Sequence, residues 1–218
     1  MLLLVFALPE EARAVRRRIR VAPGREYKRT LPGSRGEFAG QEVVLGFVGI
    51  GAADIAELEA SIELIKPRLV ISSGFAGATR SLLEAGDFVL STNYTDADIA
   101  KTLRQQNMID AAGAFAQVQR VASISDKWIL NRSQGALAVD MESKAIADLC
   151  QRQGLALVTA RMISDGIDQT IPAIFSKGKF SGFKDLGDAA AFAARMLPLT
   201  GKLADRLEAL IGVLPQHR

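Results

Sequence analysis

The sequence predicts a three-layer α/β/α fold around a central mixed sheet. Short apolar runs rich in valine, isoleucine and leucine recur along the chain, and several are apolar on both faces, as strands buried between helices are. Segments of helical periodicity separate many of them, and this alternation is typical of α/β domains. With 218 residues, 49% hydrophobic and 23% charged, the chain is expected to form one domain, 1–218, with a full core.

The expected elements follow in chain order from these patterns. Strands are expected at residues 2–8, 42–50, 68–78, 87–93, 118–125 and 155–163. Helices are expected at residues 9–19, 51–65, 98–107, 141–154 and 187–213. Turn signals at Pro32-Gly33 and Ala39-Gly40 predict a hairpin, which makes the sheet mixed. Gly154 is placed as a helix C-cap, and residues 165–185 are typical of a long loop, a common form of lid.

Composition and charge narrow the class of protein. The apolar start lacks a preceding basic segment, so it is not typical of a signal peptide, and no run is long enough for a membrane span. The lone Cys150 excludes an internal disulfide and favours the reducing cytoplasm. His217 is expected to be tail, and neither a metal nor an organic cofactor is expected.

The net charge is only +3, although five arginines gather on and after the first expected helix. A solvated helix face is the preferred interpretation; attraction to an anionic substrate or a membrane surface is the alternative. Without interleaved aromatic residues, nucleic-acid binding is not expected. These arginines are Arg13, Arg16, Arg17, Arg18 and Arg20.

Small and acidic residues follow several expected strands. Gly49 and Gly51 open a helix, where free N–H groups suit an anion, although a tight turn is the commoner reason for such glycines. Gly74 and Gly77 end a buried strand, where a ligand can approach the backbone. Because ligands bind at the carboxyl ends of strands in open α/β sheets, the segments "ALPEE", "GIG", "GFAG", "VDME" and "ISDG" are expected to share one rim.

Acidic residues at two of these strand ends are candidate catalytic groups. Asp165 directly follows an apolar strand, where it is either a cap or a group over the cleft. Apolar burial there would keep part of its population protonated, as a general acid requires. Asp168 is the weaker candidate because it lies farther into the loop. Strand alternation places Asp140 and Glu142 on the same side, so geometry alone does not separate them.

Five motifs, "GIG", "SGFAGA", "SISDKWI", "AVDMESKAIA" and "RMISDGID", resemble the purine nucleoside phosphorylase superfamily, above all its methylthioadenosine and adenosylhomocysteine nucleosidases. The resemblance covers most of the chain. It implies cleavage of a purine–ribose N-glycosidic bond, with adenine as the expected base, without a cofactor and in a homodimer. Phosphorolysis of such a nucleoside and a catalytically idle nucleoside-binding relative are the alternatives.

The resemblance also implies roles for individual residues. Asp165 matches the acid that protonates the purine at N7. Glu142 matches the carboxylate that holds the ribose hydroxyls, with Met141 backing the sugar, while Asp140 is left as a helix N-cap. "ALPEE" resembles "AMEEE", which makes Glu11 the residue that orients the attacking water, with Glu10 the near miss.

An aromatic residue in "SDKWI" is placed to stack on the base, which nominates Trp128, with a core tryptophan as the alternative; its charged neighbour Lys127 suggests a rim. Asp126 is expected to be a helix cap. Ser164, Phe75 and Gly77 belong to the matching motifs and are expected to contact the substrate.

The chain departs from the family pattern in three places. Phe75 stands where many relatives carry a small hydroxyl residue that helps to hold phosphate, and the phosphate-binding "GDP" is absent. These two differences favour hydrolysis over phosphorolysis. A segment of roughly 20 residues is missing after Tyr94, Asp96 and Asp98, the remnant of "YHDAD". This opens the site at the 5′ end of the nucleoside and brings substrates such as futalosine and adenosylhopane into competition with methylthioadenosine, and it puts the dimer interface in question.

Overall fold

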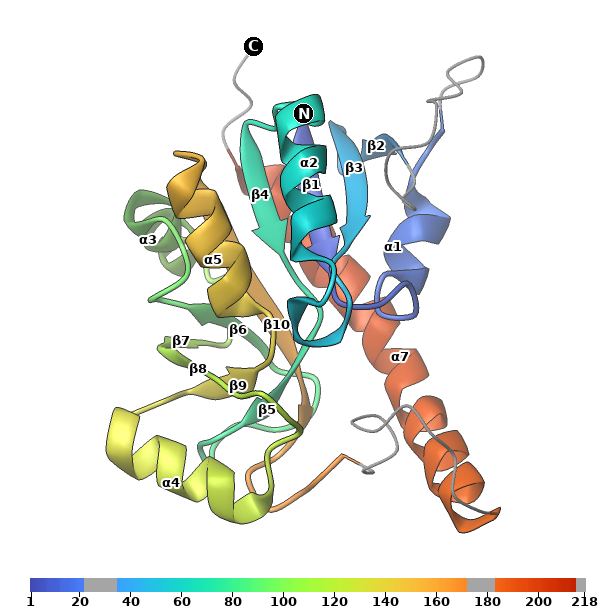
Figure 1. The fold of residues 1–218 in the computed structure, drawn as a ribbon, viewed down its shortest axis with the longest axis vertical. Coiled ribbons are helices and arrows are strands. Elements are labelled where there is room, and N and C mark those ends of the chain that lie inside the picture. Colours follow the sequence, from blue (N-terminus) through green and yellow to red (C-terminus); the bar gives the residue numbers. More distant parts are fainter. Residues whose placement is uncertain (22–34, 172–182, 215–218) are drawn as a thin grey trace.

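The computed structural model describes residues 1–21, 35–171 and 183–214, and its strands form one mixed sheet (Figure 1). The main path runs β2-β3-β1-β4-β10-β5-β9-β8, while β6 pairs with β10 and β7 pairs with β6. The strands are β1 (Leu2–Phe6), β2 (Arg35–Phe38), β3 (Gln41–Phe47), β4 (Leu69–Ser72), β5 (Phe75–Ala78), β6 (Phe88–Ser91), β7 (Ala111–Gly113), β8 (Phe115–Gln117), β9 (Ala138–Asp140) and β10 (Leu157–Asp165).

Helices cover both faces of this sheet, which confirms the three-layer prediction. One face packs on α2 and α5 through side chains such as Leu58 and Ile146, and the other on α1, α3 and α7 through Val15, Leu103 and Leu207. The helices are α1 (Arg13–Arg18), α2 (Ile55–Ile65), α3 (Ala97–Gln105), α4 (Ile124–Gln134), α5 (Ser143–Arg152) and α7 (Phe183–Val213), with a 3₁₀ turn, η1 (Ile50–Ala52).

β10 is the strand that positions the site. All nine of its residues are buried, and it pairs in parallel with β4 and β5 and antiparallel with β6. Its register against β5 shifts between Ile163, opposite Ala76, and Asp165, opposite Gly77. Such an irregularity re-aims the following side chain. The shift therefore sets Asp165 beside Gly77 at the carboxyl end of the strand.

The expected strand at residues 118–125 is wrong. The chain leaves the sheet after β8, and Ser123 caps α4 by accepting a hydrogen bond from the Asp126 N–H (3.1 Å). The Asp126 carboxylate accepts in return from the Ser123 N–H (2.9 Å), which completes a capping box and confirms Asp126 as a cap. The capping box therefore starts a helix where the apolar run predicted a strand.

Two further expectations concern the first third of the chain. α1 begins at Arg13 rather than at residue 9, because residues 8–12 form turns and the Glu11 side chain binds backbone N–H groups there. The β2–β3 hairpin turns at Ala39 and Gly40, both with positive φ (52° and 72°), as the glycine signal predicted. The expected turn at Pro32-Gly33, residues 172–182 of the expected loop, and His217 lie outside the described residues.

The basic α1 is tied to the long C-terminal helix. Arg18 Nη1 lies 2.7 Å from Asp205 Oδ1 and 3.2 Å from Glu208 Oε2, both on α7. Arg16 and Arg17 are exposed, as a solvated helix face requires. Among the described residues, no helix is both long and apolar enough to cross a bilayer.

Candidate active site

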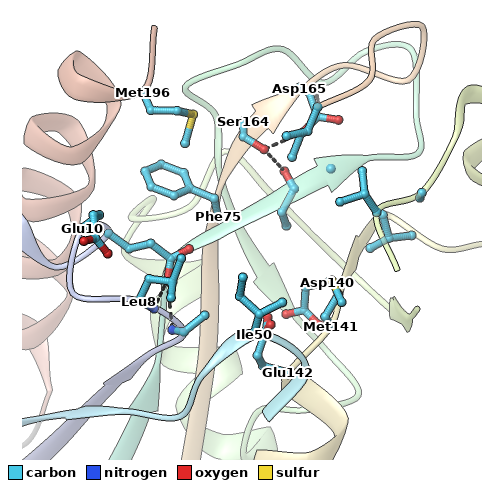
Figure 2. Close-up of a pocket in the computed structure, with 18 of the residues that line it drawn as sticks. Leu8, Glu10, Ile50, Phe75, Asp140, Met141, Glu142, Ser164, Asp165 and Met196 are labelled. Carbon is cyan, nitrogen blue, oxygen red and sulfur yellow. Dashed lines mark hydrogen bonds between the residues drawn. The ribbon is translucent and has the colours of Figure 1, made fainter. Parts of the chain in front are cut away.

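A pocket of about 420 Å³ opens at the carboxyl ends of β1, β9 and β10 and along residues 75–77 of β5. The structure brings the five expected rim segments together here (Figure 2). The expected residues that line it are Glu10, Glu11, Phe75, Gly77, Asp140, Met141, Glu142, Ser164 and Asp165, and further lining residues include Leu8, Arg13, Ile50, Val121, Ile171, Met196 and Leu197.

Glu11 lies in the turn after β1 and is folded back onto its own backbone. Glu11 Oε2 accepts hydrogen bonds from the N–H groups of Ala7 (2.9 Å) and Leu8 (3.2 Å). Gly74 makes room for it, because a Cβ there would lie 2.9 Å from Glu11 Oε2. Burial, and then the nearby charge of Glu142, raise the pKa of Glu11 to about 7, against the opposing effect of its backbone hydrogen bonds. Glu11 is thus poised to exchange a proton near neutral pH.

Replacing Glu11 by Gln is expected to change how stability depends on pH. The folded-state pKa of Glu11 is raised, so the group favours folding below about pH 4.5, and this contribution is lost as the pH rises through about 7. The raised pKa corresponds to about 3 kcal/mol at most. Compared with Glu11→Gln, the wild-type protein should lose up to that much unfolding free energy between pH 4 and pH 8, measured by urea titration. A constant difference at all pH values would contradict the raised pKa.

The two carboxylates around Met141 have different partners. Glu142 Oε1 accepts from the Gly51 N–H (2.8 Å), so the anion at this glycine turn is the protein's own side chain. Burial is the main cause that raises the pKa of Glu142. Asp140 also lines the pocket, but its carboxylate binds other parts of the chain: it accepts from the Ser143 N–H (3.2 Å), and its Oδ2 lies 3.0 Å from Arg161 Nε. Asp140 was expected to be the N-cap of α5. Its carboxylate does accept from the first N–H of this helix, but the N-cap position is occupied by Glu142.

Arg161 is a site residue that the sequence prediction missed. It lies in the middle of β10, is only 2% exposed, and its Nη2 donates to the hydroxyls of Ser72 (3.0 Å) and Ser143 (3.1 Å). Its Nη1 is buried and has no hydrogen-bond partner within the described part of the chain. Its positive charge lowers the pKa of both Glu11 and Glu142, opposing the burial effect. The sequence signal that could have identified Arg161 is a lone charged residue inside an otherwise apolar strand, because arginine is rarely buried without a partner.

Asp165 is buried as expected, at 2% exposure, but its surroundings are not only apolar. Its Oδ1 contacts the Ser164 hydroxyl and its Oδ2 contacts the ammonium of Lys127. The interpretation of Lys127 as the mark of a rim is wrong, because this side chain is only 1% exposed. In Figure 2 Asp165 and Ser164 lie together at the end of β10. Asp168 is exposed and does not line the pocket.

The expected aromatic contact is not brought to the pocket. Trp128 is 39% exposed, and its ring lies under Arg132, whose Cζ is 6.0 Å from the ring centroid. The residue before it, Lys127, takes the inward position on α4, and successive helix residues point about 100° apart. Phe75 does line the pocket, and Figure 2 shows its ring directed toward Met196.

The remnant of "YHDAD" forms local structure. Asp96 caps α3 by accepting from the N–H groups of Asp98 (3.1 Å) and Ile99 (3.3 Å). Asp98 lies in the first turn of that helix, and Tyr94 is not among the pocket-lining residues. The remnant therefore supplies a helix start rather than a wall of the pocket.

The chain is similar to known proteins over most of its length. The model of a family described as "Phosphorylase superfamily" matches residues 2–127 and 111–195. A 5′-methylthioadenosine/S-adenosylhomocysteine nucleosidase of Haemophilus influenzae is 32% identical over 165 residues, which cover 61% of this chain and 72% of the relative.

Two solved structures share the fold. A nucleosidase of the same name from Helicobacter pylori matches with a TM-score of 0.76 and 18% identity, covering 98% of both chains. Futalosine hydrolase of Helicobacter pylori matches with a TM-score of 0.74 and 18% identity, covering 98% of this chain and 97% of that one. At this identity the likeness concerns the fold.

Proposed function

Since this chain belongs to the phosphorylase superfamily, we propose that it cleaves the N-glycosidic bond of a purine nucleoside by hydrolysis and releases adenine. The observation that carries the proposal is the convergence of Glu11, Glu142 and Asp165 on one pocket, where each has a separate set of partners. The nucleosidase of Haemophilus influenzae to which this chain is similar is named for the same type of activity. A binding protein would need no acid at the purine.

The geometry supports distinct roles for the three carboxyl groups. Glu142 lies beside Ile50 in Figure 2 and offers its free oxygen to the ribose hydroxyls, while Met141 packs against the sugar. As the bond to N9 breaks, Asp165 gives a proton to N7 and the sugar becomes cationic. Water then adds to C1′ and its proton passes to Glu11, whose pKa of about 7 suits a base at neutral pH.

Phe75 supports hydrolysis over phosphorolysis. Its ring lies inside the pocket, where relatives that bind phosphate carry a small hydroxyl residue. Such a ring offers phosphate no hydrogen bond and removes volume. Arg161 Nη1 is buried and has no partner among the described residues, and a water molecule would satisfy this donor without phosphate.

The apolar end of the pocket supports a nucleoside with an uncharged 5′ substituent. Leu8, Phe75 and Met196 lie on the same side of the pocket in Figure 2, and Leu197, which also lines the pocket, is 51% exposed. The side of the wall that the missing segment builds in relatives is shortened here. We propose that the site accepts bulky apolar 5′ groups at least as well as a methylthio group.

A panel of adenosine derivatives with different 5′ groups, each incubated with and without phosphate, tests the proposed function. Free adenine should appear without phosphate, as read by chromatography, and phosphate should not accelerate it. Turnover that depends on phosphate would establish phosphorolysis instead. Tight binding of the same nucleosides without release of base would establish a nucleoside-binding protein.

We also propose that the protein is cytoplasmic and forms a homodimer. The buried, single Cys150 is compatible with a reducing compartment. Ile124, Trp128 and Ile129 form an exposed apolar surface on α4, which a second copy could cover. The measurement is the mass of the protein by light scattering; a monomer at micromolar concentration would refute the dimer.

A further inference from the structure

Lys127 is a buried cation that binds the proposed acid. Its Nζ contacts Asp165 Oδ2 and donates to the carbonyl oxygens of Gly166 (2.8 Å) and Gln169 (2.8 Å). An ammonium has three N–H donors, so these contacts use all of them. Lysine is almost never fully buried unless it is paired. A charge at this place therefore carries a desolvation cost that the surrounding structure has to offset.

Gly77 provides the space through which Lys127 reaches Asp165. A Cβ at Gly77 would lie 3.0 Å from Lys127 Cε, 3.3 Å from Lys127 Nζ and 3.3 Å from Asp165 Oδ2. Gly77 and Asp165 line the pocket, whereas Lys127 does not. The absence of a side chain at Gly77 thus leaves room for the contact between Lys127 and Asp165 as well as for a ligand in the pocket. The contact of Lys127 with a pocket-lining side chain is the one with Asp165.

We propose that Lys127 is a positioning residue for base protonation, an inference that rests on the proposed nucleoside hydrolysis. When the C1′–N9 bond breaks, its electron pair passes to the purine, and the proton of the Asp165 carboxyl group passes to N7. Asp165 is left as a carboxylate, and the Lys127 ammonium, which keeps its three protons throughout, stabilises that charge. Its bonds to Gly166 and Gln169 fix the end of β10, so the carboxyl group faces the pocket.

A purely structural tether would have different consequences. It would affect every reaction in the pocket equally, because the pocket as a whole would loosen. Stabilisation of the Asp165 carboxylate matters only for a leaving group that has to be protonated. A purine nucleoside has such a leaving group, whereas 4-nitrophenyl β-D-ribofuranoside releases a stable phenolate without a proton.

The experiment compares Lys127→Met with wild type on both substrates. Lys144→Met is the matched control, since Lys144 forms an exposed pair with Asp148 (2.6 Å) away from the pocket. We expect Lys127→Met to lower kcat for adenine release by about 100-fold with KM within about 3-fold, and to leave cleavage of the nitrophenyl riboside within about 3-fold. Equal losses on both substrates, or no loss on the purine nucleoside, would overturn the proposal.

A double-mutant cycle and a binding measurement complete the test. In an Asp165→Asn background, Lys127→Met should cause no further loss of adenine release; an additional 100-fold loss would overturn the inference. Adenine titration by calorimetry is read independently of turnover: Lys127→Met should weaken binding about 10-fold, and unchanged affinity would overturn the inference. If the wild-type protein releases no base from any nucleoside, the proposed function fails, and with it the role in protonation, while the adenine titration still decides whether Lys127 contributes to binding of the base.

Discussion

Asp165→Asn is expected to lower adenine release by about 10²- to 10⁴-fold, the range for loss of a general acid. The amide has nearly the shape of the carboxyl group but has no acidic proton for N7. The loss should fall on kcat, because the acid acts as the bond to the base breaks. The measurement is the initial rate on the best nucleoside of the panel, followed by chromatography of the released base.

The same substitution also has a stability cost that must be separated from the chemistry. The amide replaces the carboxyl group that contacts the buried Lys127 ammonium, and removing one partner of a buried pair costs about 3–5 kcal/mol. Thermal unfolding should therefore be recorded first and rates taken well below the transition. Asp148→Asn, which removes the exposed partner of Lys144, serves as the control. Activity of Asp165→Asn within about 10-fold of wild type would exclude this residue as the acid.

Glu142→Gln is expected to lower kcat/KM by about 100-fold, because charge-assisted hydrogen bonds to the ribose contribute about 1.5–3 kcal/mol each. The charge of Glu142 is also a cause of the raised pKa of Glu11. Removing that charge lowers the pKa of Glu11 from about 7 toward 4.5, so the ionised base persists at lower pH. The acid limb of the pH–rate profile should move to lower pH.

Glu63→Gln, an exposed change on α2, is the control for this second experiment and should leave both the rate and the profile unchanged. A loss of rate with an unmoved acid limb would mean that Glu142 binds ribose but does not interact with Glu11. A wild-type profile with no acid limb near pH 7 would show that Glu11 is not the base that the reaction uses.

Hydrophobic patterning was sufficient for most of the fold. Strand β10 follows from a continuous apolar run, which is typical of a strand buried on both faces, and helix α5 follows from apolar residues at helical spacing. It failed at residues 118–125, where the apolar residues belong to a loop and the start of α4. There a capping box between Ser123 and Asp126 decides the local structure, and a partly apolar run of eight residues carries too little information to exclude it.

The sequence by itself determined that Glu11, Glu142 and Asp165 follow buried strands, because an apolar run marks each strand. Their meeting in one pocket depended on the topology, since β9, before Glu142, runs antiparallel to β5, whereas β10, before Asp165, runs parallel to it. Only the tertiary structure decided their partners. Lys127 faces inward and Trp128 outward because the cap of α4 fixes the rotation of that helix, and the pairing of β10 with β5 brings Asp165 to a lysine 38 positions away. Such contacts depend on packing between distant segments, and no local pattern encodes them.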